Sequence, residues 1–95
     1  MPAYLISIID IHDPAGYEEY RKLVAPALKQ YGGRFLVRGG KIHPLEGTWV
    51  PKRVVVVEFD TVEQAKAFDA APEYAQAKAI RHRTSTSSVI VVEGV

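Results

Sequence analysis

Two charged residues lie in apolar surroundings, where they could bind or activate a small molecule. Arg38 follows the apolar residues 35–37, and Glu58 directly follows four valines. A planar guanidinium can bind a carboxylate or a phosphate through two parallel hydrogen bonds. A carboxylate in an apolar setting can serve as a general base. The alternative is a structural salt bridge, in which the two side chains only neutralise each other.

Three further side chains are candidates for a binding site. His12 has the same strand parity as Asp10, so the two could form an acid–base pair, although polar residues are also normal at a strand end. Trp49 lies in a predicted loop, where it could close a pocket or pack across a dimer interface. The hydroxyl of Tyr74 could reach toward a pocket mouth, or its ring could simply anchor a short helix. We therefore add these three residues to Arg38 and Glu58 as ligand-binding candidates.

The histidines and glycines lack the spacing of known metal and cofactor sites. The histidines are His12, His43 and His82, and no two of them lie four residues apart as in a helical zinc motif. His82 lies near the end of a predicted helix, where a cation interacts favourably with the helix dipole. The chain has no cysteine, phosphate-binding loop, dinucleotide fingerprint or serine elbow. The sequence therefore predicts neither a metal nor a cofactor.

The composition is typical of one ordinary globular domain. The chain has 95 residues, of which 47% are hydrophobic and 24% are charged, enough for one core but not for two. No apolar run approaches the ~20 residues that a membrane helix needs. With a formal net charge of +1, the protein should not be strongly attracted to nucleic acid or to an anionic membrane. A cytoplasmic location is the default expectation for a chain without cysteine.

The pattern of apolar residues predicts alternating strands and helices. Strands are expected over residues 2–11, 34–42, 52–60 and 85–93, and helices over residues 14–31, from the capping box at Thr61 to Pro72, and over residues 73–82. Pro26 should kink or break the first helix, because its nitrogen cannot donate a hydrogen bond. Gly39 and Gly40 should produce a bulge or bend in the second strand. This order predicts an α+β fold with one domain over residues 1–95, a ferredoxin-like sandwich whose four-stranded antiparallel sheet is covered by helices on one face.

The two faces of the predicted sheet should differ in their surroundings. Phe59 and Phe68 are expected to meet in the core, which turns Val55, Val57 and Phe59 toward the helices. The opposite face then carries five apolar side chains, namely Tyr4, Ile6, Ile8, Val54 and Val56. Such a patch measures several hundred Å², which is large for a monomer, so we expect a second copy to cover it in a homodimer. If Arg38 and Glu58 also point away from the helices, they project into the space between the two subunits.

The same fold also occurs in RNA-binding domains, which place aromatic side chains on the third strand. The corresponding positions here are Val54 and Val56, and a valine has no ring on which a base can stack. The low net charge agrees with this difference. The sequence therefore does not predict a nucleic-acid partner.

Short motifs along almost the whole chain resemble a known family. They are the run from Tyr31 to Gly40, Leu45-Glu46-Gly47, the strand from Arg53 to Phe59, Pro72-Glu73-Tyr74, Arg81 and Val92-Glu93-Gly94. Together they resemble the small bacterial proteins classed as domain of unknown function 1330. The resemblance implies membership of the dimeric α/β barrel superfamily, in which two ferredoxin-like sheets face each other. Some members of that superfamily are oxygenases or isomerases that need no cofactor.

We therefore expect a homodimer that binds a small anionic molecule. Such a protein could also be an enzyme that acts on this molecule without a cofactor. The alternative is an assembly or interaction module without catalysis, whose apolar sheet face serves only dimerisation. The two hypotheses differ in the space that they require. A ligand-sized cavity edged by Arg38 and Glu58 would favour binding, whereas Ile8, Val54 and Val56 filling the space between the sheets would favour assembly.

Overall fold

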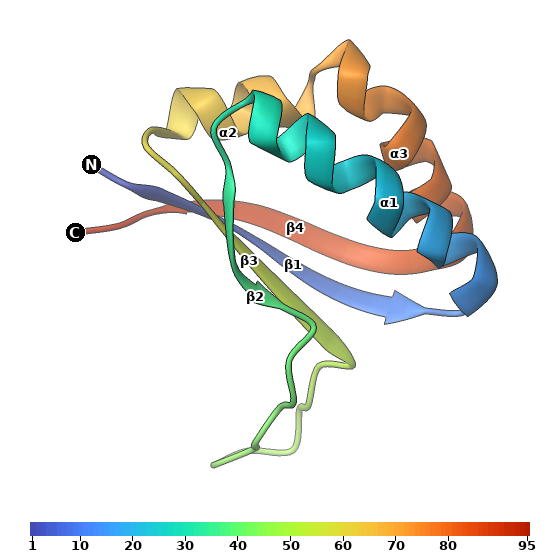
Figure 1. Cartoon of the computed structure of the whole chain (residues 1–95). Helices are drawn as coiled ribbons and strands as arrows, with labels where there is room; N and C mark the ends of the chain where they lie inside the picture. The colour runs from blue at the N-terminus through green and yellow to red at the C-terminus, as the bar shows by residue number, and fades with distance from the viewer.

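The computed structural model describes residues 1–95 as a ferredoxin-like sandwich (Figure 1). Its elements are β1 (Ala3–Ile11), α1 (Pro14–Gln30), β2 (Arg34–Arg38), β3 (Arg53–Phe59), α2 (Val62–Asp69), α3 (Pro72–Thr84) and β4 (Ser85–Glu93). The strands form one antiparallel sheet in the order β2-β3-β1-β4, with all three helices on one face. This confirms the predicted fold class. None of the three helices combines the length and the apolar character required to cross a membrane.

The core lies between the helices and the sheet face that the sequence predicts. Val55, Val57 and Phe59 are all buried on the helix side of β3. The rings of Phe59 and Phe68 meet with their centroids 5.8 Å apart, as expected. Phe68 also packs on Tyr74, at a centroid distance of 4.3 Å, so its ring joins α2 to both the sheet and α3. Each such side chain contributes about 1.5–3 kcal/mol through burial of its apolar surface.

Helix α1 begins where the sequence predicts and continues through Pro26 to Gln30. Of the two expected outcomes, a kink or a break, the break is therefore wrong. Asp13 caps the helix by accepting a hydrogen bond from the backbone N–H of Gly16. Pro26 lies on the exposed side of the helix, where the free carbonyl of Lys22 can bind water. The absence of this hydrogen bond therefore costs little stability. The buried side chains on either side of Pro26 hold the helix on the sheet.

Strand β2 is shorter than predicted and contains an irregularity that decides the orientation of its side chains. Arg34 lies opposite Glu58, and Phe35 lies opposite Val57. The register then shifts between Phe35 and Val37, so that Arg38 lies opposite Val55 on the helix side of the sheet. A bulge of this kind inserts one extra residue and reverses the faces of all the residues that follow. The chain leaves the sheet at Gly39, which has a positive φ of 73°.

The second face of the sheet carries no helix and is rich in apolar side chains (Figure 1). We call it the open face; its apolar residues are Tyr4, Ile6, Ile8, Val37, Val54, Val56, Ile90 and Val92. Ile90 is 58% exposed, Val92 is 44% exposed and Val37 is 39% exposed, while the others are half-buried. The apolar face that the sequence predicts is confirmed, and it extends onto β4.

Replacing Phe68 with alanine should destabilise the fold strongly, because it removes a ring that joins three elements. We expect the free energy of unfolding to fall by about 3–5 kcal/mol, measured by urea titration followed by circular dichroism. Leu23→Ala is the matched control, because Leu23 lies 38% exposed on α1, and it should cost no more than about 1 kcal/mol. Equal losses in the two variants would contradict the assignment of Phe68 to the core.

Candidate functional site

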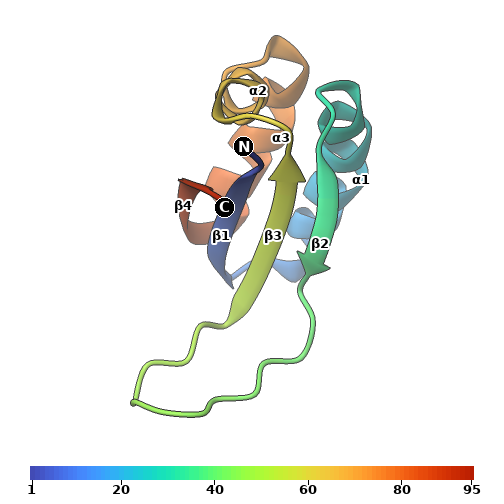
Figure 2. The same ribbon diagram turned by 90° about the vertical axis from the view of Figure 1, so that its left-hand side faces the viewer.

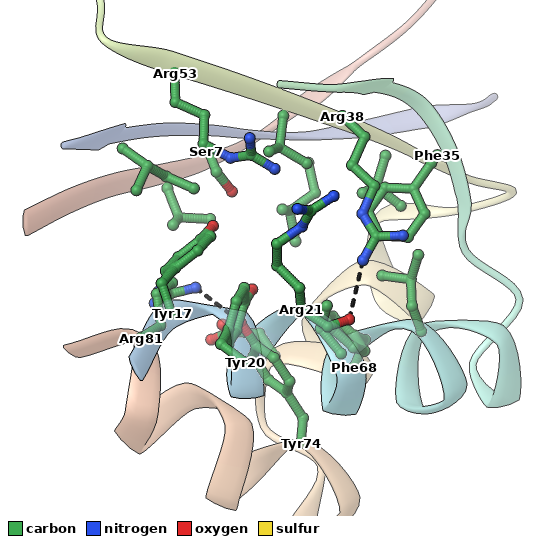
Figure 3. A pocket seen from close by; sticks show the side chains of 18 residues that line it. Ser7, Tyr17, Tyr20, Arg21, Phe35, Arg38, Arg53, Phe68, Tyr74 and Arg81 are labelled. Atoms are coloured by element: carbon green, nitrogen blue, oxygen red, sulfur yellow. Dashed lines mark hydrogen bonds between the residues drawn. The ribbon is translucent and has the colours of Figure 1, made fainter. Parts of the chain in front are cut away.

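A cavity lies between α1 and the sheet, and both aromatic and basic side chains line it (Figure 3). The aromatic residues are Tyr17, Tyr20, Phe35, Phe68 and Tyr74, and the basic residues are Arg21, Arg38, Arg53 and Arg81. The volume in which a water molecule can be centred is about 30 Å³. A water needs roughly 10–15 Å³ on this measure, so the cavity has room for about two.

The arginines reach the cavity from different elements and at different depths. Arg21 comes from α1, Arg38 ends β2 and Arg53 begins β3, and Figure 3 shows Arg21 and Arg53 extending toward a common space between the two layers. Arg38 is exposed, Arg21 and Arg53 are half-buried, and Arg81 of α3 is only 5% exposed. The cavity therefore opens to solvent beside Arg38 and ends inside the core at Arg81.

Of the four lining arginines, only Arg21 pairs with a carboxylate, at 3.0 Å between its Nη1 and Oε1 of Glu18. Arg38 donates from Nη2 to the backbone carbonyl of Arg21 at 2.9 Å, and its guanidinium lies 4.3 Å from the centre of the Phe35 ring. Arg53 lies over the ring of Tyr17 at 5.6 Å.

The buried Nε atoms of Arg21, Arg53 and Arg81 have no hydrogen-bond partner. Asp69 is the one carboxylate among the lining residues, and it pairs with Lys78 at 3.0 Å. The cavity thus combines an excess of positive charge with unused hydrogen-bond donors, which is an environment suited to an anion.

The inner end of the cavity holds a small network of hydroxyl groups. Arg81 donates from Nη1 to the hydroxyl oxygen of Tyr74 at 2.8 Å, and the hydroxyls of Tyr74 and Tyr20 lie 3.0 Å apart. Burial raises the pKa of both Tyr74 and Tyr17 above the ordinary value for a phenol, because the phenolate would lose its hydration. These two hydroxyls therefore keep their protons at neutral pH and can donate hydrogen bonds, but they cannot act as bases.

The expected meeting of Arg38 and Glu58 is wrong. Glu58 points to the open face and pairs with Arg34, at 3.1 Å between its Oε1 and Nη2 of the arginine. Arg34 also reaches Asp60 at 3.1 Å. In a regular strand, Arg34 and Arg38 would point to the same face, but the bulge in β2 sends Arg38 to the other side of the sheet. Glu58 does form a salt bridge, as the sequence suggested, but its partner is Arg34 and not Arg38.

The remaining predicted residues lie in three different places. Tyr74 lines the cavity together with Arg38. His12 is exposed between β1 and α1, where its backbone N–H donates to the carbonyl of Thr84 at 3.0 Å. Trp49 is 70% exposed and borders the open face. The structure therefore brings together only Arg38 and Tyr74 from the predicted set. No group of three or more histidine, aspartate or glutamate side chains is placed to hold a metal ion.

Two cavity residues that the sequence analysis missed carry a recognisable signal. Arg21 lies four residues after Tyr17 and three before Val24, so it belongs to the buried stripe of α1. Arg53 has the same parity as Val55, which places it on the helix side of β3. A charged residue at a position that periodicity assigns to the core is a sign of a binding site.

Solved structures resemble this chain over nearly its whole length. A protein of unknown function from Rhodopseudomonas palustris has a TM-score of 0.79 and 18% identity, and the match covers 99% of this chain and 82% of that one. SnoaB, a cofactor-independent oxygenase from Streptomyces nogalater, has a TM-score of 0.71 and 14% identity, with coverage of 99% and 93%. A dimeric protein of unknown function from Bacteroides fragilis, with a ferredoxin-like fold, has a TM-score of 0.63 and 18% identity, with coverage of 98% and 96%. At these identities the likeness establishes the fold alone.

The family of the chain follows from a comparison of sequences. No curated protein matches the chain. The family model described as domain of unknown function DUF1330 matches residues 2–95, which is almost the entire sequence. The motifs that suggested this family, from Tyr31 to Gly94, all lie within the match. The chain therefore belongs to the DUF1330 family.

Proposed function

We propose that this protein is a homodimer that binds a small molecule with a flat apolar body and one negatively charged group, such as an aromatic carboxylate. The observation that carries the proposal is the convergence of Arg21, Arg38 and Arg53 on one aromatic cavity. Arg21 pairs with Glu18 at 3.0 Å, whereas Arg38 and Arg53 have no carboxylate partner. A half-buried charge without a counter-charge, such as that of Arg53, is costly to a fold. An anionic ligand would supply both the missing charge and the missing hydrogen-bond acceptors.

Binding requires the cavity to widen. The present volume accommodates about two waters, whereas an aromatic carboxylate is several times larger. Arg38 is exposed, and the side chain of Arg21 is 40% exposed, so both can rotate outward without disturbing the core. Side-chain rearrangements of this kind are common on binding, while the backbone moves little. The ring of Phe35, on which Arg38 now lies, would then be free to contact the ligand.

Catalysis at this site would depend on the arginines. The oxygenase of similar fold makes a cofactor-independent reaction a reasonable hypothesis, although this is an analogy between folds. Tyr17 and Tyr74 are protonated at neutral pH and cannot remove a proton from a substrate. The guanidinium groups can instead stabilise negative charge on a bound molecule. The geometry thus supports binding of an anion more directly than it supports a particular reaction.

The open face supports the second part of the proposal, self-association. Its eight apolar side chains form a surface larger than a monomer usually exposes, and one of the similar structures is dimeric. The cavity lies on the opposite side of the sheet from this surface. A dimer that packs through its open faces would therefore leave the cavity accessible, so dimerisation does not compete with binding.

The binding proposal predicts that benzoate and related aromatic carboxylates raise the melting temperature, whereas the neutral analogue benzamide does not. A ligand at one hundred times its Kd stabilises a protein by about 2.7 kcal/mol, which shifts the melting temperature of a domain of this size by roughly 10 °C or more. Differential scanning fluorimetry measures this shift. Equal effects of benzoate and benzamide would contradict a site built for an anion.

Arg38→Met should weaken benzoate binding by about 10- to 100-fold, because a hydrogen bond to a charged group contributes roughly 1.5–3 kcal/mol. Isothermal titration calorimetry gives the affinity. The matched control is Arg34→Met, which changes an arginine of the same strand that points to the open face, and it should leave the affinity unchanged. A similar loss in both variants would indicate a general effect of charge.

The dimer proposal predicts a mass of about twice 10.5 kDa in sedimentation equilibrium at micromolar concentration. Val56→Lys should yield a monomer, because a lysine in the centre of the interface would lose its hydration without gaining a partner. Leu23→Lys adds the same charge on the outer side of α1 and should remain dimeric. A monomeric wild-type protein would overturn this part of the proposal.

A further inference from the structure

The long loop between β2 and β3 projects away from the rest of the molecule. It comprises residues 39–52, and we call it the arm. Figures 1 and 2 both show the arm extending beyond the end of the sheet, on the side away from the helices. A loop of this length without secondary structure is uncommon in a small domain and usually has a function.

The arm presents apolar side chains that the rest of the chain does not cover. Leu45 is 97% exposed, Trp49 is 70% exposed and Val50 is 47% exposed. None of them belongs to the hydrophobic core. Tryptophan is the largest apolar side chain, and it is enriched at the centre of protein interfaces and depleted from free surfaces. These exposed fractions indicate that another surface covers the apolar side chains of the arm when the protein is assembled.

The apolar surface of the arm is continuous with the open face. Trp49 and Val50 border a groove of about 230 Å³ at one end of the sheet, together with Ile8 and Ser88, which belong to the open face. The arm and the open face therefore form one surface with two parts. A partner that covers the open face would lie beside the arm.

We infer that the arm is a clasp, which packs Trp49 and Leu45 against the second copy of this chain in the homodimer. The inference rests on the proposed dimer and adds an element to its interface. A two-fold axis relates the two subunits of such a dimer, so each arm would extend along its partner and two clasps would form. In this structure the arm does not cover the cavity of its own subunit, because Trp49 borders a groove with Ile8 of the open face.

The clasp would also connect the interface to the binding site. Arg38 directly precedes the arm and Arg53 directly follows it, and both line the cavity. The backbone N–H of Gly39 donates to the carbonyl of Val54 at 3.0 Å, which fixes the start of the arm to β3. Gly39 has a φ of 73°, which other residues rarely adopt, and a side chain here would also displace the guanidinium of Arg53. Docking of the arm on the partner would thus hold both arginines in place.

Trp49 is the only tryptophan in the chain, so its fluorescence reports directly on the arm. We expect its emission to shift to shorter wavelengths, and its quenching by acrylamide to weaken several-fold, as rising protein concentration converts monomer into dimer. Both changes should follow the same curve as the mass measured by sedimentation. In Val56→Lys, which should be monomeric, the emission should remain that of an exposed indole at every concentration.

Trp49→Ala should raise the Kd of the dimer by about 30-fold, which corresponds to loss of a strong interface contact. Leu23→Ala is the control and should leave this Kd unchanged, and circular dichroism should confirm that both variants are folded. A dimer in which Trp49 stays fully quenchable and Trp49→Ala has the wild-type Kd would overturn the clasp alone. A protein that remains monomeric with an exposed Trp49 would overturn both the clasp and the proposed dimer.

Discussion

The bulge in β2 is the constraint on which the rest of this site depends. Without it, Arg34 and Arg38 would point to the same face of the sheet, and the cavity would lose the arginine at its opening. With it, Arg34 neutralises Glu58 on the open face while Arg38 contributes to the cavity on the other side. One extra residue in an edge strand thus separates a structural ion pair from a group that is available to a ligand. Bulges of this kind commonly redirect a side chain beside a binding site.

The two faces of the sheet consequently differ in the side chains that they present. The helix side holds the core and encloses a cavity in which Arg38, Arg53 and Arg81 have no carboxylate partner. The open side presents valine, isoleucine and tyrosine, and it continues into the arm that carries Trp49. A second copy on the open side would bury apolar surface without blocking the cavity. Because Arg38 and Arg53 flank the arm, the interface and the cavity would share a physical connection even though they lie on opposite sides.

Much of the fold could be predicted from the sequence, because strands and helices here obey their ordinary periodicities. The alternation of Val55, Val57 and Phe59 identified the core face, and the caps at Asp13 and Thr61 located the starts of two helices. Pro26 was misleading because the cost of a proline depends on what surrounds the freed carbonyl. In the structure, Lys22 and Pro26 both lie on the exposed side of the helix.

The candidate site was less predictable, since it depends on the register of β2. Periodicity treats Arg38 as a neighbour of Glu58, and no residue type in residues 34–38 marks the bulge that separates them. Arg21 and Arg53, by contrast, occupy positions that periodicity assigns to the core, so they could have been recognised. The exposure of Trp49 could not be predicted, because residues 39–52 have no regular periodicity that would assign their side chains to the core or to the surface.

The most direct test of the account is a crystal structure of the protein with para-bromobenzoate, in which the anomalous signal of bromine locates the ligand. We expect the bromine on the helix side of the sheet near Phe35 and Tyr20, with the carboxylate between Arg21, Arg38 and Arg53. Bromine bound between the open faces of two subunits, or a cavity that stays closed at saturating ligand, would contradict the assignment of the arginine cavity as the binding site.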